Sequence, residues 1–445
     1  MDLKSLRSEL DRRRVAVWSA GEKIWKPIPV ALTPTIVMRS EWQDVVSDAR
    51  RIFNTFPKVL SWLQRPEQAH LKEGVFAGLS SIERAVIDID PLAQWGQVTA
   101  RFDLFWDGDQ IKIIEVNCTI PAMQSYSDGV LNAWLKASGQ DVLTRGNMGQ
   151  LLESLLSAYR RNGGRTESPK VAILHRAGDS QLGELMSLQE EWGKYGVQAV
   201  LATPSMVARS ANQWFVGEMP VDLIYRHIFA WRLEDSPFAN CLINNRQTHI
   251  YNPVSAHYES KAFLALVSHL VSDTHRARDV GFSSDEMAAV NLRVPWSRIL
   301  DQGPLSVPFE EVKERLPDLV FKRSVGYGGH QVIMGQDWET QETQARLQQL
   351  TGHLRHVDFN HFASWILKQD TSLWIAQNRM SGAQRRTQVL CGDQVEEWDG
   401  WFDASVFIDS GKSPVCSGGV SRISKSPIVN IGTGGGLAPF QIIDN

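Results

Sequence analysis

The sequence lacks several features that mark common classes of protein. Its N-terminal segment, MDLKSLRSELDRRRVAVW, has no apolar core of the kind found in signal peptides. No run approaches the roughly 20 apolar residues that cross a bilayer. Lys and Arg total 46 against 50 for Asp and Glu, a formal net charge of -4, so no basic excess indicates nucleic acid. We therefore expect a cytoplasmic protein with neither a membrane nor a nucleic-acid partner.

Cysteine is scarce as well. Four cysteines (Cys118, Cys241, Cys391 and Cys416) lie far apart with no CxxC pair, a pattern that indicates neither a disulfide framework nor a cysteine zinc site. The chain also lacks internal repeats, low-complexity segments, and the GxxxxGK[ST] and GxGxxG glycine motifs. The missing glycine motifs disfavour P-loop and Rossmann nucleotide sites. The scattered cysteines indicate reduced thiols.

The length of the chain and the spacing of its apolar residues indicate several α/β lobes. With 445 residues and 43% hydrophobic content, about two to four subdomains are expected. Helical spacing between about 40 and 85 gives way to a hairpin pattern over 99–117 and then to alternating strands and helices over about 165–255. Further on, DLVFKRSVGYGGHQVIMG predicts strand, glycine loop and strand, and ASWILKQDTSL predicts another short apolar strand.

Four polar residues in the hairpin pattern carry the strongest functional signal. Arg101, Asp103, Glu115 and Asn117 have the offsets 0, 2, 14 and 16. If the turn around DGD holds an odd number of residues, 103 pairs with 115 and 101 with 117, and all four face one way. A two-residue turn would put the carboxylates on opposite faces. With the odd-numbered turn, the face opposite the four polar residues would carry an apolar layer, namely Phe102, Leu104, Trp106, Ile114 and Val116.

The chemistry of this quartet suits a metal and a phosphate. Two carboxylates and an amide oxygen are ligands for a hard cation such as Mg2+, and an adjacent arginine can hold a phosphate or a developing negative charge. The alternative is a half-buried hairpin whose polar side meets water. Asp and Asn are poor strand formers, and Glu115 and Asn117 follow three isoleucines, which disfavours a solvated face.

Two lysines and a glycine loop are candidates for binding phosphates. Lys322 lies on a predicted strand that runs into a loop with Gly326, Gly328 and Gly329, whose bare backbone can approach anions. Lys261 lies near the start of an amphipathic helix. Each has an ordinary alternative, since a strand followed by glycines is often a hairpin turn and a helix lysine is often solvated.

Taken together, these segments resemble the circularly permuted ATP-grasp family, whose best-known members are glutathionylspermidine synthetase-like amide ligases. The resemblance rests on the order of RFDLFW…KIIEVNCTIP, VAILHRAG…DLIYR, NPVSAHYESKAFLAL, LVFKRSVGYGGHQVIMG, WILKQD and GGVSRISKSPIVNIGTGGG, and it covers roughly residues 90 to 445. It implies an α/β fold with α+β lobes and a small α/β layer that precedes the ATP-grasp core. The N-terminal region is expected to be helical.

The resemblance also implies lobe boundaries. They are a mainly helical region over 1–90, the first part of the metal-binding lobe over 91–160, a small substrate-side α/β domain over 161–255, an ATP-binding lobe with the glycine loop over 256–370, and a return to the metal-binding lobe over 371–445.

The roles that the resemblance implies can be assigned to individual residues. Asp103, Glu115 and Asn117 match the magnesium ligands, and Arg101 matches the arginine that steadies the reacting groups. Lys261 and Lys322 match lysines that hold nucleotide phosphates, and the loop 326–329 matches the lid. WILKQD matches the hinge that reads adenine, where Lys368 and Gln369 stand in a region usually bearing Gln or Glu.

The implied activity is an ATP-dependent carboxylate–amine ligase. It would form an amide or peptide bond through an acyl phosphate, with ATP and Mg2+ as cofactors and a small-molecule or peptide carboxylate and an amine as substrates. An ATP-dependent phosphotransferase on the same fold and a non-catalytic ATP-binding regulatory protein are the alternatives, with a dinucleotide oxidoreductase further behind. A homodimer is compatible with the resemblance, although the sequence shows no interface signature.

Other polar residues are weaker candidates. Arg226 ends a predicted strand and could contact substrate, although a surface arginine paired to Glu234 or Asp235 is an equal alternative. One of Arg385, Arg386 and Arg422 could bind a carboxylate or phosphate, and we favour Arg422. His353, His356 and His361 include one HxxH spacing, but no flanking acid or cysteine pattern supports a zinc site.

Overall fold

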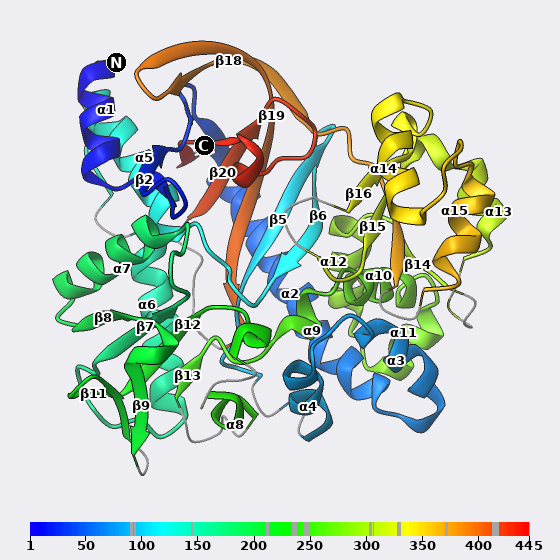
Figure 1. Cartoon of the computed structure of the whole chain (residues 1–445), viewed down its shortest axis with the longest axis horizontal. Helices are drawn as coiled ribbons and strands as arrows, with labels where there is room; N and C mark the ends of the chain where they lie inside the picture. The colour runs from blue at the N-terminus through cyan, green and yellow to red at the C-terminus, as the bar shows by residue number, and fades with distance from the viewer. Residues whose placement is uncertain are drawn as a thin grey trace.

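The chain folds into a mixed α/β structure built around three larger β-sheets (Figure 1). This computed structural model describes residues 1–444 except 90–91, 93–94, 144–145, 211–212, 234–237, 244–248, 302–304, 306, 327–330, 370–372 and 412–417. Within that part of the chain, no helix combines the length and the apolar character needed to span a membrane.

The largest sheet joins segments from the start, the first quarter and the end of the chain. Its strands, in order across the sheet, are β18 (Ala383–Cys391), β3 (Val30–Ala31), β21 (Gly436–Ala438), β20 (Gly419–Ser424), β19 (Gln394–Asp409), β5 (Thr99–Asp107) and β6 (Gln110–Asn117). β18 pairs with β19 as well as with β3, so five of these strands form a closed cycle. Residues 30–31 are therefore part of the same sheet as the hairpin and the C-terminal strands.

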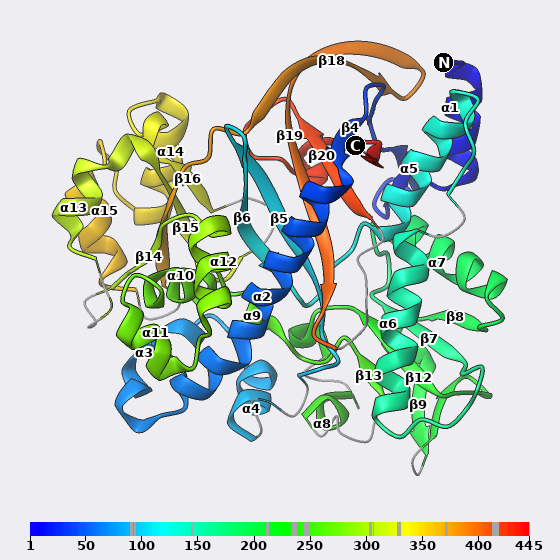
Figure 2. The ribbon, with the colours of Figure 1, turned by 180° about the vertical axis from the view of Figure 1, so that it is seen from behind.

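Helix α2 (Arg39–Leu63) covers the back of this sheet (Figure 2). Its buried face repeats at helical spacing, including Trp42, Val45, Phe53 and Phe56, and packs in one core with residues of β5 and β6. Phe53 meets Phe102 edge-on, with ring centroids 5.4 Å apart. The predicted helical region between about 40 and 85 is completed by α3 (Ala69–Phe76) and α4 (Ser81–Ile89).

The N-terminal region is not purely helical. Helix α1 (Leu3–Arg12) is followed by the hairpin of β1 (Ala16–Ser19) and β2 (Ile24–Pro27), and β4 (Thr35–Met38) pairs in parallel with β22 (Phe440–Ile443) near the end of the chain. The pairing of β4 with β22 joins residues more than 400 positions apart, which local patterns do not reveal.

The β5–β6 hairpin has the expected pairing at its polar end, but it reaches that pairing differently. Arg101 pairs with Asn117 and Asp103 with Glu115. The turn holds two residues, with Asp107 opposite Gln110 and Gly108 at φ 60°, which alone would split the carboxylates. A bulge between Asp103 and Leu104 restores the register.

The bulge also changes which residue faces the core. Leu104 pairs with Ile113, so the extra residue, Ile114, is unpaired in the ladder. Ile114 therefore lies on the same side as Glu115 and lines a cavity, whereas Ile111 and Ile113 join the core. The prediction that Ile114 belongs to the apolar face was wrong, because a bulge shifts the alternation of side chains by one residue.

A second, parallel sheet corresponds to the alternating pattern between about 165 and 255. Its order is β13 (Ile250–Tyr251), β12 (Leu223–His227), β7 (Val171–His175) and β8 (Ala199–Ala202). Helices α6 (Asn147–Arg161) and α7 (Leu182–Lys194) pack against it through Leu151, Leu155 and Leu185. Continuous apolar strands of this kind are typical of a parallel sheet covered by helices.

The third sheet is antiparallel, in the order β14 (Ser297–Leu300), β17 (Trp374–Asn378), β15 (Leu319–Arg323) and β16 (Val332–Met334). Its core is rich in aromatic rings, with Phe321 packing against Trp338, Phe359 and Phe362. Helices α10 (Lys261–Leu270), α14 (Gln341–Thr351) and α15 (Phe359–Ile366) complete this part of the chain.

The segment ASWILKQ is not the strand that its apolar run suggested. Asp358 caps α15 by accepting a hydrogen bond from the His361 backbone N–H, and the buried residues 359, 362, 363 and 366 follow helical spacing. Lys368 and Gln369 follow the end of this helix. The strand of the sheet is β17, WIAQN, a few residues later.

Candidate active site

A cavity of about 540 Å³ lies between the hairpin side of the largest sheet and the antiparallel sheet. Its volume is in the range of small-molecule sites. Strands β5, β6 and β20 contribute one wall, and β15, β16 and β17 contribute the other. Eight of the residues predicted from sequence line it: Arg101, Asp103, Glu115, Asn117, Lys261, Lys322, Gly326 and Arg422.

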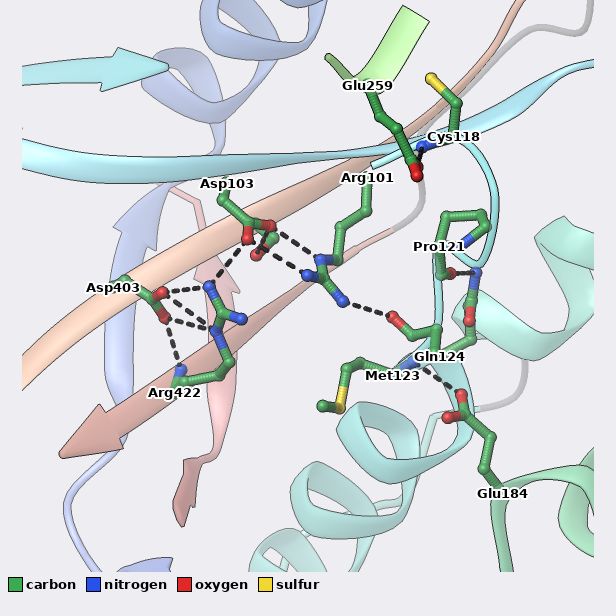
Figure 3. Close-up of polar contacts among 12 residues, drawn as sticks. Arg101, Asp103, Cys118, Pro121, Met123, Gln124, Glu184, Glu259, Asp403 and Arg422 are labelled. Carbon is green, nitrogen blue, oxygen red and sulfur yellow. Dashed lines mark hydrogen bonds and ion pairs between the residues drawn. The ribbon is translucent and has the colours of Figure 1, made fainter. Parts of the chain in front are cut away.

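A chain of alternating charges runs along the floor of the cavity (Figure 3). Arg101 binds Asp103 through two bonds, Nε to Oδ1 at 2.7 Å and Nη2 to Oδ2 at 3.1 Å. Arg422 Nη2 donates to Asp103 Oδ2 at 3.0 Å, and Arg422 Nε donates to Asp403 Oδ2, also at 3.0 Å. Asp103 thus separates two guanidinium groups that both line the cavity.

The electrostatics of this chain follow from burial and charge pairing. Burial raises the pKa of Asp103, but Arg101 and Arg422, with the hydroxyl of Ser405, more than offset this and hold it well below its ordinary value. Burial raises the pKa of Asp403 to about 6, although Arg422 opposes the rise. Asp103 is therefore a firmly ionised group that orients both arginines.

The same end of the hairpin contacts the lysine of α10. Lys261 Nζ lies 2.8 Å from Glu115 Oε1 and donates to the Gly326 carbonyl at 2.9 Å. This ammonium therefore joins the metal-ligand candidate on β6 to the first glycine of the loop that follows β15. Asn117 Nδ2 is buried and has no hydrogen-bond partner among the described residues.

Lys322 is the second lysine of the cavity. It is buried on β15, and its Nζ donates to Gln377 Oε1 on β17 at 2.7 Å. Burial lowers the pKa of Lys322 to about 8, while Glu115 opposes the shift and Lys261 adds to it. An anion close to this group would favour its charged form.

The donor set fits a magnesium ion best at Glu115 and Asn117. Glu115 and Asn117 lie two residues apart on β6 and both line the cavity, and their carboxylate and amide oxygens are hard ligands of the kind that magnesium prefers. Asp103 fits less freely, because its two oxygens already accept bonds from Arg101, Arg422 and Ser405. It can join such a site by exchanging one of these bonds.

The structure gives no support to a second metal site among the histidines. His356 pairs with Glu339 at 2.8 Å and His361 with Asp358 at 2.9 Å. Across the described ranges, no group of three or more His, Cys, Asp or Glu side chains is arranged to hold a metal ion.

Several predicted residues are not among the described residues that line the cavity. Gly328 and Gly329 fall outside the described residues, as do Glu234 and Asp235. Lys368 and Gln369 are not among the described residues that line the cavity, so their adenine contacts stay a prediction, and residues 377–380, in and just after β17, line it. Arg386 forms an exposed ion pair with Glu397, and Arg385 stacks over Phe402 and binds the carbonyl of Pro34.

Arg226 is a buried structural residue and not a surface one. Its guanidinium donates to the carbonyl oxygens of Ile228, of Asn252 at 2.9 Å and of Pro253 at 2.8 Å. Its relative exposure is 1%, and it is not part of the cavity lining. The predicted substrate contact at this strand end is therefore not supported, because backbone carbonyls occupy the side chain.

Sequence reasoning missed Asp403 and Gln377. Asp403 lies in the apolar strand WFDASVFID, and a carboxylate in such a strand was the same signal that identified Glu115. Gln377 follows WIA in β17, and its partner Lys322 is 55 residues away. The pairing of these side chains could be found only from the fold.

Comparisons with known proteins show the fold. The chain resembles a glutathione synthetase-like effector from Globodera pallida, solved in its apo form, with a TM-score of 0.57 and 9% identity over 96% of this chain and 89% of that one. A gamma-glutamylcysteine synthetase candidate from Methylobacillus flagellatus KT aligns with a TM-score of 0.43 and 12% identity over 82% and 88%. No protein-family model and no curated protein matches the sequence. The chain thus has a glutathione synthetase-like fold.

Proposed function

We propose that this chain is an ATP-dependent carboxylate–amine ligase of the permuted ATP-grasp type, forming an amide or peptide bond through an acyl phosphate. One observation carries the proposal. Arg101, Asp103, Glu115 and Asn117 from one sheet meet Lys261 and Lys322 from α10 and β15 in a single cavity. The fold shared with a glutathione synthetase-like protein supports the same class of reaction.

The charge of the cavity favours a polyphosphate. Six cationic side chains line it against two carboxylates, Asp103 and Glu115; the six are Arg101, Lys261, Lys322, Arg323, Arg379 and Arg422. A cleft with such an excess of one sign attracts and concentrates ligands of the opposite sign. ATP carries the required negative charge, and Lys261 and Lys322 are the groups we assign to its phosphates.

An apolar part of the same cavity suits a purine. Phe105, Ile114, Val320, Val332 and Met334 line the space between the two sheets. Flat apolar walls of this kind stack on aromatic rings, and the adjoining strand end at Asn378, Arg379 and Met380 offers polar groups for the base edge. We therefore propose residues 377–380 as the adenine-reading segment in place of Lys368 and Gln369.

Magnesium would be held by Glu115 and Asn117, joined by Asp103. When bound there, the ion would supply charge neutralisation of the phosphate oxygens during transfer. For this arrangement, Lys261 has to release Glu115 and turn toward the phosphates. Its present contacts, with Glu115 and the Gly326 carbonyl, are those that nucleotide binding would replace.

Arg101 and Arg422 would bind the reacting groups. The substrate carboxylate oxygen attacks the γ-phosphorus, ADP leaves, and the amine nitrogen then attacks the acyl carbon and loses a proton as phosphate departs. The two guanidiniums, which are held on either side of Asp103, would stabilise the negative charge that develops on oxygen in both steps.

The proposal can be tested by supplying the purified protein with ATP, Mg2+ and a panel of amino acids, short peptides and other acids, with hydroxylamine as a surrogate amine. We expect ADP and a hydroxamate to form together with at least one class of acid. ADP with a phosphorylated product and no hydroxamate would instead indicate a phosphotransferase. Failure of ATP to bind at all would contradict both.

A further inference from the structure

The turn that precedes helix α5 (Gln124–Ala137) is an unusual part of the cavity wall. Its last residue, Met123, lines the cavity and is the N-cap of α5, yet it has a left-handed backbone (φ 98°) and no side chain that can cap the helix. The first N–H groups of a helix need acceptors. We refer to residues 121–123 as the α5 turn.

Glu184 supplies the missing acceptor from a different part of the fold. It lies on α7, which packs on the parallel sheet, and it is 1% exposed. Its Oε1 accepts a hydrogen bond from the backbone N–H of Met123 at 2.7 Å (Figure 3). It accepts a second from the backbone N–H of Ser125 at 3.3 Å. A buried carboxylate therefore caps α5 across the boundary between two sheets.

The other side of the same turn holds Arg101. Arg101 Nη1 donates to the carbonyl oxygen of Ala122 at 3.1 Å. The peptide group that joins Ala122 to Met123 thus presents its oxygen to Arg101 and its N–H to Glu184. A shift of this peptide would move the acceptor that fixes one end of the guanidinium.

We propose that Glu184 is a positioning residue for Arg101, acting through the Ala122–Met123 peptide. It touches neither the cavity nor the reacting groups, since it is absent from the lining. Its position on α7 couples the parallel sheet to the orientation of the arginine. The effect on activity rests on the proposed ligase function, whereas the effect on Arg101 itself does not.

Arg422 provides an internal control. It shares Asp103 with Arg101 but is otherwise held by Asp403, with no bond to the α5 turn. A general loosening of the cavity would free both arginines. Loss of the Glu184 cap should free Arg101 alone.

The first experiment measures the reaction of each arginine with phenylglyoxal, read by peptide mass spectrometry, in the wild-type protein and in Glu184→Ala. We expect modification of Arg101 to rise about fivefold or more, from loss of a helix cap, with Arg422 unchanged within about twofold. Glu184→Gln keeps an acceptor oxygen and should label like the wild type. If the alanine variant does not fold, Glu184→Asp, with its shorter reach, should show the same direction.

A matched control removes another buried cap from the same region. Asp128, on α5, is 3% exposed and accepts hydrogen bonds from the Asn147 and Met148 N–H groups at 2.9 Å each, capping α6. Asp128→Ala should leave the labelling of Arg101 unchanged. Equal labelling of Arg101 in Glu184→Ala and the wild type, or a rise shared by Arg422 or by Asp128→Ala, would overturn the proposal.

A double-mutant cycle tests the effect on turnover. Glu184→Ala should lower kcat about tenfold while the KM for ATP stays within about twofold, and it should add nothing in an Arg101→Ala background. Independent, multiplying losses would show that Glu184 acts by another route. A wild-type protein that binds ATP but forms no product would count against the ligase, while the labelling result would still decide the role of Glu184.

Discussion

Two buried arginines in two different sheets have different partners. Arg226, at the end of β12 in the parallel sheet, is 1% exposed and donates to three backbone carbonyls. Arg422, on β20 of the largest sheet, is 8% exposed and binds the carboxylates of Asp103 and Asp403. Both were candidates for substrate binding on sequence grounds, but only Arg422 lines the cavity.

The difference shows that the partners of a buried guanidinium indicate its role better than its place on a strand. Backbone carbonyls fix Arg226 as a clamp between β12 and the segment at 252–253. Ion pairs with carboxylates link Arg422 through Asp103 to Arg101, and all three side chains line the cavity. We expect substitutions of the two arginines to differ accordingly, in catalysis at Arg422 and in stability at Arg226.

The largest effect is expected at the polar end of the hairpin. Glu115→Gln and Asp103→Asn should each lower ATP turnover by at least about 100-fold, because one removes a metal-ligand charge and the other the anion that orients both arginines. Glu115→Gln should keep a melting temperature close to that of the wild type, since Glu115 is only half-buried. Retained turnover in both variants would contradict the assignment of the site.

The next prediction compares the two arginines directly. Arg422→Lys should lower turnover about tenfold or more, because lysine does not reproduce the fork between two carboxylates. Arg226→Lys should instead destabilise the fold by about 2 kcal/mol, because it leaves buried carbonyls without donors. Chemical denaturation and steady-state kinetics on both variants test this contrast, and a catalytic loss confined to Arg226→Lys would reverse it.

A smaller effect is expected for the protonation of Lys322. Because its pKa is about 8 in the free protein, the ammonium is lost as pH rises through that value. The affinity for ATP should therefore weaken by about threefold to tenfold between about pH 7 and 9. In Lys322→Arg, which stays charged, this dependence should disappear, whereas Lys322→Ala should bind ATP weakly at every pH. An identical pH profile in wild type and Lys322→Arg would argue against the role of Lys322.

The smallest effect is expected at the surface. Arg386 and Glu397 form an exposed ion pair on β18 and β19, and neither residue lines the cavity. Arg386→Ala should change neither turnover nor the denaturation midpoint measurably, since exposed pairs contribute little. A clear loss of activity here would mean that a second functional surface exists on this hairpin.

The polar quartet was predictable because its signal is local. Asp, Glu and Asn within apolar strands contradict strand propensity, and such a conflict marks functional positions. The bulge that gives the quartet its shared face was not predictable, since Gly108 and Asp109 are compatible with either turn length. The prediction of the pairs Arg101–Asn117 and Asp103–Glu115 was therefore correct because two deviations compensate: the turn holds two residues, and a bulge shifts the register by one.

The errors have a common physical origin in long-range packing. The run ASWIL has strand-like composition, but the core around Phe321 and Trp338 selects its helical spacing. From the sequence alone, Arg226 matches the pattern of a ligand-binding residue at a strand end. In the fold, the carbonyl oxygens of residues 252 and 253 accept its hydrogen bonds. Asp403 acts on Arg422, 19 residues away, and Glu184 acts on Met123, 61 residues away, so no local pattern contains their roles.

The most direct test of the central claim is a calorimetric titration of ATP, with and without Mg2+, into the wild-type protein, Glu115→Gln and Lys322→Ala. If the two walls of the cavity act on one nucleotide, Mg2+ should tighten wild-type binding about tenfold, Glu115→Gln should lose this gain, and Lys322→Ala should weaken binding in both conditions. Absence of ATP binding to the wild type, or a full Mg2+ gain in Glu115→Gln, would contradict the account.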